Sequence, residues 1–217
     1  MNIYRLKSIA IAATLVACAA SAQAVPLLTE DFSSVAALAG SGWVMTNAST
    51  AGGSTGWYQG DATVFPAQAG ADNSYIAANY NNAPVGGTIS NWLITPEFST
   101  AQAGTITFFA KADIFAPYSD QIAFGLSGGS SAIGAFTLGP AVTVTGDWTE
   151  YSVSYAAQGA GSTARFAISY MGAADLSNYV GIDTLTVSAV PEPSTMLLLA
   201  GGLLGVAAVA RRAAAKR

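Results

Sequence analysis

Histidine is absent from the 217-residue chain, and cysteine occurs only once, as Cys18. The absence of histidine excludes Ser-His-Asp and Cys-His catalysis and every histidine-based metal site. Cys18 lies in an apolar N-terminal segment, so a chain trimmed of that segment has no disulfides and no zinc–thiolate cluster. A glycosidase with two carboxylates remains formally open, but no spacing singles out a pair. We therefore expect a protein that is not an enzyme.

Positive charge is also scarce, and it is unevenly distributed. Six of the eight basic residues lie in the first 24 and the last 28 residues. Between these ends, only Lys111 and Arg165 stand against eleven acidic residues, which gives a formal charge of −9. This charge argues against nucleic acid and anionic membrane surfaces as partners, and it is compatible with cation binding.

Residues 1–24 have the features of a signal peptide. Two basic residues come first, an apolar stretch follows, and Ala22-Gln23-Ala24 fits the small-x-small site that signal peptidase cleaves. The preceding Leu-Val-Ala-Cys also fits a bacterial lipobox, in which Cys18 would be lipidated. We favour cleavage after Ala24, because a C-terminal anchor would make a lipid redundant.

Residues 190–217 have three parts in order. These are a polar motif (190–195) with Pro191-Glu192-Pro193, an uncharged apolar run (196–210), and a basic tail (211–217) that begins with Arg211 and Arg212. As a transmembrane helix the run would be about 22 Å long against a hydrocarbon core of about 30 Å, so it needs the snorkelling stems of the two arginines at the membrane boundary. Because basic residues flank both apolar segments, we expect both ends in the cytoplasm and the middle outside.

This arrangement resembles the PEP-CTERM sorting signal of bacterial surface proteins. The resemblance implies an exosortase substrate, since exosortase is a membrane protease thought to cut near Pro-Glu-Pro. It further implies an inner-membrane intermediate in a Gram-negative bacterium, followed by the cell surface or extracellular matrix. Such signals accompany exopolysaccharide production and biofilm formation.

Residues 25–189 are long enough for one domain and show an apolar/polar alternation of period two. The alternation is clearest at 105–110, 121–126, 151–155, 165–170 and 184–188, with Gly- and Pro-rich turns between. Only one helical turn is expected, at 34–39. About ten short strands with one apolar face each predict an all-β fold, a two-sheet antiparallel β-sandwich of jelly-roll type, with a closed barrel as the alternative.

A second resemblance lies within this domain, to the choice-of-anchor J and cleaved-adhesin group. It is carried by Glu30-Asp31-Phe32, Gly42-Trp43, Trp57, the Asn-Trp-Leu-Ile-Thr-Pro stretch at 91–96 and Gly181-Ile182-Asp183, in that order. The stretch at 91–96 is the most specific part. The resemblance implies a jelly roll related to MAM-type domains, with adhesion or glycan contact as the usual function.

Two carboxylates share strand parity with apolar neighbours: Glu30 near the first expected strand and Asp183 near the last. If those strands run side by side, two buried acids cannot both stay ionised without a counter-charge. A structural calcium ion with backbone carbonyl ligands would supply it, and Asp31 or Asp72 would add a ligand. The alternative is that both acids face water at strand ends.

Aromatic residues supply the other candidates. Trp43, Trp92 and Trp148 precede strands and are expected in the core. Trp57, Tyr58, Tyr80 and Tyr118 lie in loops, where exposed rings would stack on sugars while Gln59, Asp61, Asn81 or Asn82 bonds the hydroxyl groups. The alternative is that these rings pack over a sheet edge.

Together these features predict an exported surface or matrix protein, a non-catalytic structural or adhesive component associated with exopolysaccharide or biofilm. One alternative is a carbohydrate-binding module with a defined glycan ligand. A more remote alternative is an ice-binding protein, which would need a flat threonine ladder that Thr105 and Thr107 alone do not form. Exosortase, signal peptidase and exopolysaccharide are the expected partners.

Overall fold

The fold is taken from a computed structural model, which describes residues 24–190 and positions 202, 205, 206, 211 and 214. The predicted signal peptide and most of the predicted transmembrane helix lie outside the described residues. The described positions beyond 200 have helical backbone. Within the part of the chain that the structure describes, no helix is long and apolar enough to span a membrane.

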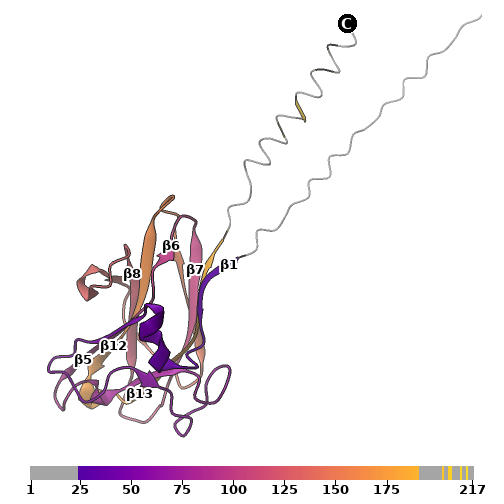
Figure 1. Cartoon of the computed structure of the whole chain (residues 1–217). Coiled ribbons are helices and arrows are strands. Elements are labelled where there is room, and N and C mark those ends of the chain that lie inside the picture. Colours follow the sequence, from indigo (N-terminus) through magenta and orange to yellow (C-terminus); the bar gives the residue numbers. More distant parts are fainter. Residues whose placement is uncertain (1–23, 191–201, 203–204, 207–210, 212–213, 215–217) are drawn as a thin grey trace, which may run out of the picture. The chain divides into compact units, whose positions relative to one another are not determined.

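Residues 24–190 form two antiparallel sheets, so the predicted β-sandwich is confirmed (Figure 1). The first sheet has the order β11 (Thr149–Tyr155), β7 (Gly104–Ala112), β13 (Tyr179–Ala189), β4 (Ile76–Asn79), β3 (Tyr58–Gln59), with β1 (Val25–Glu30) also beside β13. The second has the order β10 (Val142–Thr143), β8 (Gln121–Ser127), β12 (Thr163–Ala173), β5 (Thr88–Ile94), β2 (Val44–Asn47); β9 (Thr137–Leu138) pairs with β8, and β6 (Phe98–Ser99) with β12.

Four short 3-10 helices lie in the connections: η1 (Val35–Ser41), η2 (Tyr80–Asn82), η3 (Ile133–Ala135) and η4 (Ala174–Leu176). The helical turn predicted at 34–39 corresponds to η1. The other three have only three residues each, which is too short for a helical period to show in the sequence.

The core lies between the two sheets and follows the predicted alternation. Every second residue of β7 is buried, among them Phe108, whereas β12 is buried on both faces from Phe166 to Tyr170. The Phe108 ring stacks on Tyr151 at 5.4 Å between centroids and meets Phe124 edge-on at 5.2 Å. Such aromatic pairs contribute about 0.5–1.5 kcal/mol each beyond the area they bury.

Strand β13 exchanges partners along its length. Its first residues pair with β4 and its last residues with β1, while β7 pairs along its other side. The pairing is irregular between Asp183 and Thr186, at the point of exchange. The first and last strands of the domain therefore do lie side by side, as predicted for Glu30 and Asp183.

Candidate functional site

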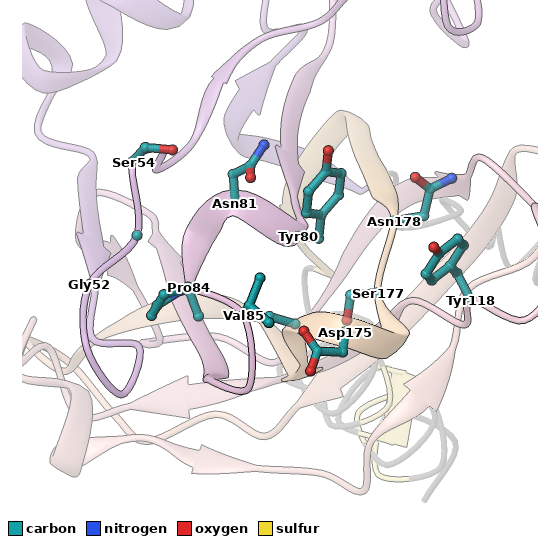
Figure 2. Close-up of a pocket in the computed structure, with 13 residues that line it drawn as sticks. Gly52, Ser54, Tyr80, Asn81, Pro84, Val85, Tyr118, Asp175, Ser177 and Asn178 are labelled. Atoms are coloured by element: carbon teal, nitrogen blue, oxygen red, sulfur yellow. The ribbon is translucent and has the colours of Figure 1, made fainter.

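A pocket of about 830 Å³ lies where the β4–β5, β7–β8 and β12–β13 connections meet (Figure 2). The strand registers place these connections together, since Tyr179 pairs with Asn79, and Ala173 with Thr88. The β2–β3 loop closes another side of the pocket through Gly52, Gly53 and Ser54. The site is thus built from segments that are far apart in the sequence.

Two exposed tyrosine rings line this pocket. Tyr80 is 47% exposed and Tyr118 is 38% exposed. Figure 2 shows both rings near Asn178, which lies between the segments that carry them. Val85, which also lines the pocket, is 93% exposed, so the pocket combines apolar surface with polar groups.

Local hydrogen bonds explain why the Tyr80 ring is presented to solvent. The Asn79 side chain caps η2 by accepting from the backbone N–H of Asn81 at 3.0 Å, and the Tyr80 N–H donates to the carbonyl oxygen of Asn178 at 3.0 Å. Asn79 also accepts from the Thr55 hydroxyl at 3.1 Å. The backbone at Tyr80 is therefore fixed from both sides while the ring stays free.

The floor of the pocket is held by Asn82, which is fully buried. Its side-chain amide donates to the Thr55 hydroxyl at 2.9 Å and to the Gly56 carbonyl at 3.1 Å, and it accepts from Asn91 at 3.0 Å. The β2–β3 loop can approach this closely only because residue 53 is glycine; a β-carbon there would collide with the Asn81 carbonyl oxygen. Asn82, a predicted sugar contact, is structural instead.

Asp175 and Asn178 present acceptor oxygens beside the rings. Both carboxylate oxygens of Asp175 lie 3.0 Å from the Gly86 N–H. Asn178 donates its side-chain amide to the carbonyl and carboxylate oxygens of Asp113, at 2.8 and 3.0 Å. Neither tyrosine hydroxyl of the pocket, at Tyr80 or Tyr118, has a hydrogen-bond partner among the described residues.

A buried acid supports the pocket from below. Asp120 is 1% exposed and accepts from the Tyr170 hydroxyl at 2.6 Å and from the backbone N–H groups of Asn178 and Tyr179 at 2.8 and 3.2 Å. Burial raises the pKa of Asp120 above its ordinary value, although these donors oppose the rise. Asp120 thereby fixes the backbone that carries Asn178.

The predicted stacking residues have different positions in the structure. The Trp57 ring is only 8% exposed and belongs to the main core, so the expectation of an exposed ring is wrong there. Tyr58 is half-buried against Tyr179, with 6.2 Å between centroids. Gln59 binds internal backbone groups, among them the Val35 N–H at 2.9 Å and the Phe32 carbonyl at 2.8 Å. Of the four stacking candidates, Tyr80 and Tyr118 line the pocket, whereas Trp57 and Tyr58 do not.

Of the three tryptophans expected in the core, only Trp43, at 4% exposed, belongs to the main core. Trp92 is 9% exposed and is buried in a separate cluster with Ile94 and Ala167. Trp148 is half-buried and packs edge-on against Phe65 at 5.6 Å, in a separate aromatic cluster. Asp61, another predicted sugar contact, caps a turn by accepting from the Thr63 N–H at 2.8 Å.

The structure places Glu30 and Asp183 in different surroundings. Asp183 is fully buried and accepts from the backbone N–H groups of Gln68, Ala69 and Thr184 at 2.8, 3.2 and 2.6 Å. Thr184 has φ +49°, which is strained for a β-branched residue and turns its N–H toward this carboxylate. Burial raises the pKa of Asp183, and hydrogen-bond donors supply part of the compensation that calcium was predicted to give.

Glu30 is half-buried and accepts from the Phe32 N–H at 2.9 Å; burial is the main cause that raises its pKa. With Asp31 and Thr184 it lines a second hollow, of about 490 Å³. Among the described residues, no group of three or more His, Cys, Asp or Glu side chains is placed to hold a metal ion. The calcium site stays a prediction.

Sequence reasoning missed several residues of the first pocket, namely Ser54, Val85, Asp175 and Asn178. The available signals were weak: the Gly-Gly and Pro-Val-Gly-Gly turns at 52–53 and 84–87, and the apolar Ile-Phe-Ala-Pro-Tyr loop at 114–118. Nothing in the sequence indicates that these turns meet.

A family model, the PEP-CTERM protein-sorting motif, matches residues 189–212. This motif implies export, a cell-surface destination and processing as an exosortase substrate. No curated protein matches the chain. The match at 189–212 thus agrees with the sorting signal that the sequence predicts at 190–217.

Solved structures with this fold include cleaved adhesin domains of Lys-gingipain from Porphyromonas gingivalis W83. The K1 domain is 23% identical with a TM-score of 0.57, and the match covers 76% of this chain and 98% of that one. The K3 domain is 20% identical with a TM-score of 0.55, covering 76% of this chain and 99% of that one. At this identity the likeness establishes the cleaved-adhesin type of sandwich and nothing about ligands.

Proposed function

We propose that this protein is a non-catalytic adhesive component of the bacterial surface or extracellular matrix, and that its β-sandwich binds glycan. The sorting motif at 189–212 supports the destination. The observation that carries the adhesive part is the pocket in which Tyr80 and Tyr118 expose their rings beside unsatisfied polar groups. Tyrosine rings offer a flat apolar face to the C–H groups of a sugar, and neighbouring acceptors bind its hydroxyl groups.

The glycan-binding proposal is tested with immobilised polysaccharides. The exported protein should be retained, and Tyr118→Ala and Tyr80→Ala should each weaken retention about tenfold or more. Ile133→Ala, at a 37% exposed apolar residue of η3 that does not line the pocket, is the matched control and should bind as the unmodified protein does. Equal retention of all four proteins would remove the pocket from the proposal.

The sorting proposal needs a separate experiment. Cells that carry the chain with and without residues 190–217 are fractionated, and the ends of the mature protein are determined by mass spectrometry. Surface attachment should require the tail, with an N-terminus that begins after Ala24 and a C-terminus trimmed near Pro191-Glu192-Pro193. An untrimmed chain in the cytosol would contradict it.

We also propose a structural calcium ion at the Glu30 hollow, where two acidic side chains adjoin the β1–β13 pair. A ligand that binds only the folded state raises the free energy of unfolding by about 2.7 kcal/mol when its free concentration is 100 times Kd. Calcium should therefore raise the melting temperature by several degrees and EDTA should lower it, with Glu30→Gln removing the response. An unchanged melting temperature in both conditions would end this proposal.

A further inference from the structure

The Tyr80–Tyr118 pocket is lined by one carboxylate, that of Asp175, and by no cation; its other polar side chains are neutral hydroxyl and amide groups. The Asp175 carboxylate has one described donor, the Gly86 N–H, and so keeps most of its capacity to accept hydrogen bonds. The Asn178 amide N–H groups are committed to Asp113, which leaves its side-chain oxygen for a ligand. Beside Asp175 and the Asn178 oxygen, a ligand gains hydrogen bonds by bringing donors and gains no ion pair by bringing an anion.

The cations of residues 24–190 are engaged elsewhere. Lys111 lies over the ring of Phe65, with its Nζ 5.0 Å from the ring centroid. Arg165 donates to carbonyl oxygens, among them Thr95 at 2.8 Å and Gly129 at 3.0 Å. Neither side chain lines the pocket. An anionic ligand would therefore lose hydration beside Asp175 and gain no counter-charge.

A neutral sugar meets neither obstacle. Its hydroxyl groups donate to carboxylate and amide oxygens, and hydrogen bonds to an ionised acceptor are the stronger kind. Its C–H faces pack on the exposed tyrosine rings, which gain apolar contact without any change of charge. The same pocket thus favours neutral glycans and disfavours anionic ones.

We propose that this pocket selects uncharged glycans and rejects those that carry carboxylate or sulfate groups. The inference rests on the proposed glycan-binding function and specifies its ligand class. An acidic polysaccharide would then have to be recognised at another place or through a bridging cation, since the wall around Asp175 repels it.

The experiment uses affinity electrophoresis of the exported protein in gels that contain a β-glucan, an α-glucan, a xylan or a galactan. Each neutral polymer is compared with its own carboxymethylated and sulfated derivatives, so that backbone and linkage stay constant. We expect retardation by at least one neutral polymer and at least about tenfold weaker binding of its charged derivatives. Raising the salt concentration should reduce the difference in affinity between neutral and charged polymers, because salt screens the repulsion between Asp175 and the anionic groups.

The variants separate this inference from the proposed function. Ser54→Lys places a cation in the lining and should improve binding of the charged derivatives about tenfold, while Ile133→Ala should behave as the unmodified protein. Equal binding of neutral and charged forms that is lost in Tyr118→Ala would overturn the inference and leave glycan binding intact. Binding that Tyr118→Ala does not affect would overturn the assignment of the pocket. No binding to any polymer would overturn both proposals.

Discussion

Two groups of aromatic residues in this domain differ in how their polar atoms are satisfied. In the cluster of Phe65, Tyr75, Trp148 and Tyr179, the Tyr75 hydroxyl donates to the Asp61 carbonyl at 2.8 Å and lies 3.0 Å from the Tyr179 hydroxyl. The Trp148 Nε1 donates to the Pro66 carbonyl at 3.0 Å. In the pocket, the hydroxyls of Tyr80 and Tyr118 have no described partner. The Tyr118 ring stacks on the exposed Phe115 ring at 6.1 Å between centroids, so both rings in this contact remain at the surface. Hydroxyl groups bonded inside the protein indicate a role in stability, whereas exposed rings with hydroxyls that have no described partner are suited to binding.

The strongest test of this difference is truncation of one ring from each group. Tyr75→Ala removes a fully buried ring and should lower the free energy of unfolding by about 3–5 kcal/mol, because it leaves a cavity. Tyr118→Ala should change it by less than about 0.5 kcal/mol, since the ring is exposed. Chemical denaturation measures both values, and a similar loss in both variants would erase the distinction.

A finer test removes only the hydroxyl groups. Tyr75→Phe leaves the Asp61 carbonyl and the Tyr179 hydroxyl short of a partner, so we expect a loss of about 1–2 kcal/mol in unfolding free energy. Tyr80→Phe breaks no described hydrogen bond and should stay within about 0.5 kcal/mol. Denaturation compares the two variants under one condition, and an equal loss would show that the Tyr80 hydroxyl has a structural partner.

The smallest expected effect concerns pH and Asp120, the acid beneath the pocket. Because its pKa is raised in the folded state, the folded protein binds the proton more tightly than the unfolded chain. Stability should therefore fall as pH rises above the ordinary value of 3.8, until the folded pKa is passed, with a slope of at most about 1.4 kcal/mol per pH unit for one group.

Asp120→Asn should remove this part of the slope above pH 4, as followed by melting temperature against pH. Asp61→Asn is the control: hydrogen bonds from Thr63 lower the pKa of Asp61, so that group titrates below this range. An unchanged slope in Asp120→Asn would show that Asp120 has no raised pKa.

The sandwich itself could be predicted because burial within a strand is a local property. Ile106, Phe108 and Ala110 occupy every second position of one strand, as Phe166, Ile168 and Tyr170 do of another, and that spacing already indicates which face they bury. Trp57 shows the limit of such reasoning. Its neighbours are typical of an exposed loop, yet Asn82 holds the preceding Gly56 carbonyl at 3.1 Å and the ring enters the core.

The pocket could not be predicted, because its residues come from distant parts of the sequence and local patterns do not show that they meet. Tyr80, Tyr118 and Asn178 come together only through the pairing of distant strands, and alternation says nothing about which strand ends meet. The Asp183 carboxylate is buried, but the strand parity with Leu185 and Val187 on which the expectation of burial depended is interrupted by the irregularity between Asp183 and Thr186. Its compensation by the N–H groups of residues 68 and 69 depends on a loop that is over 110 residues away in sequence.

The two ends of strand β13 carry different parts of the domain. Val25 pairs with Ala189, so the chain enters and leaves at one end of this strand, while Asn178, beside its other end, lines the pocket. Eleven residues of extended backbone span roughly 35 Å. Within the domain, the pocket and the residue at which the chain continues into the sorting motif therefore lie at opposite ends of β13.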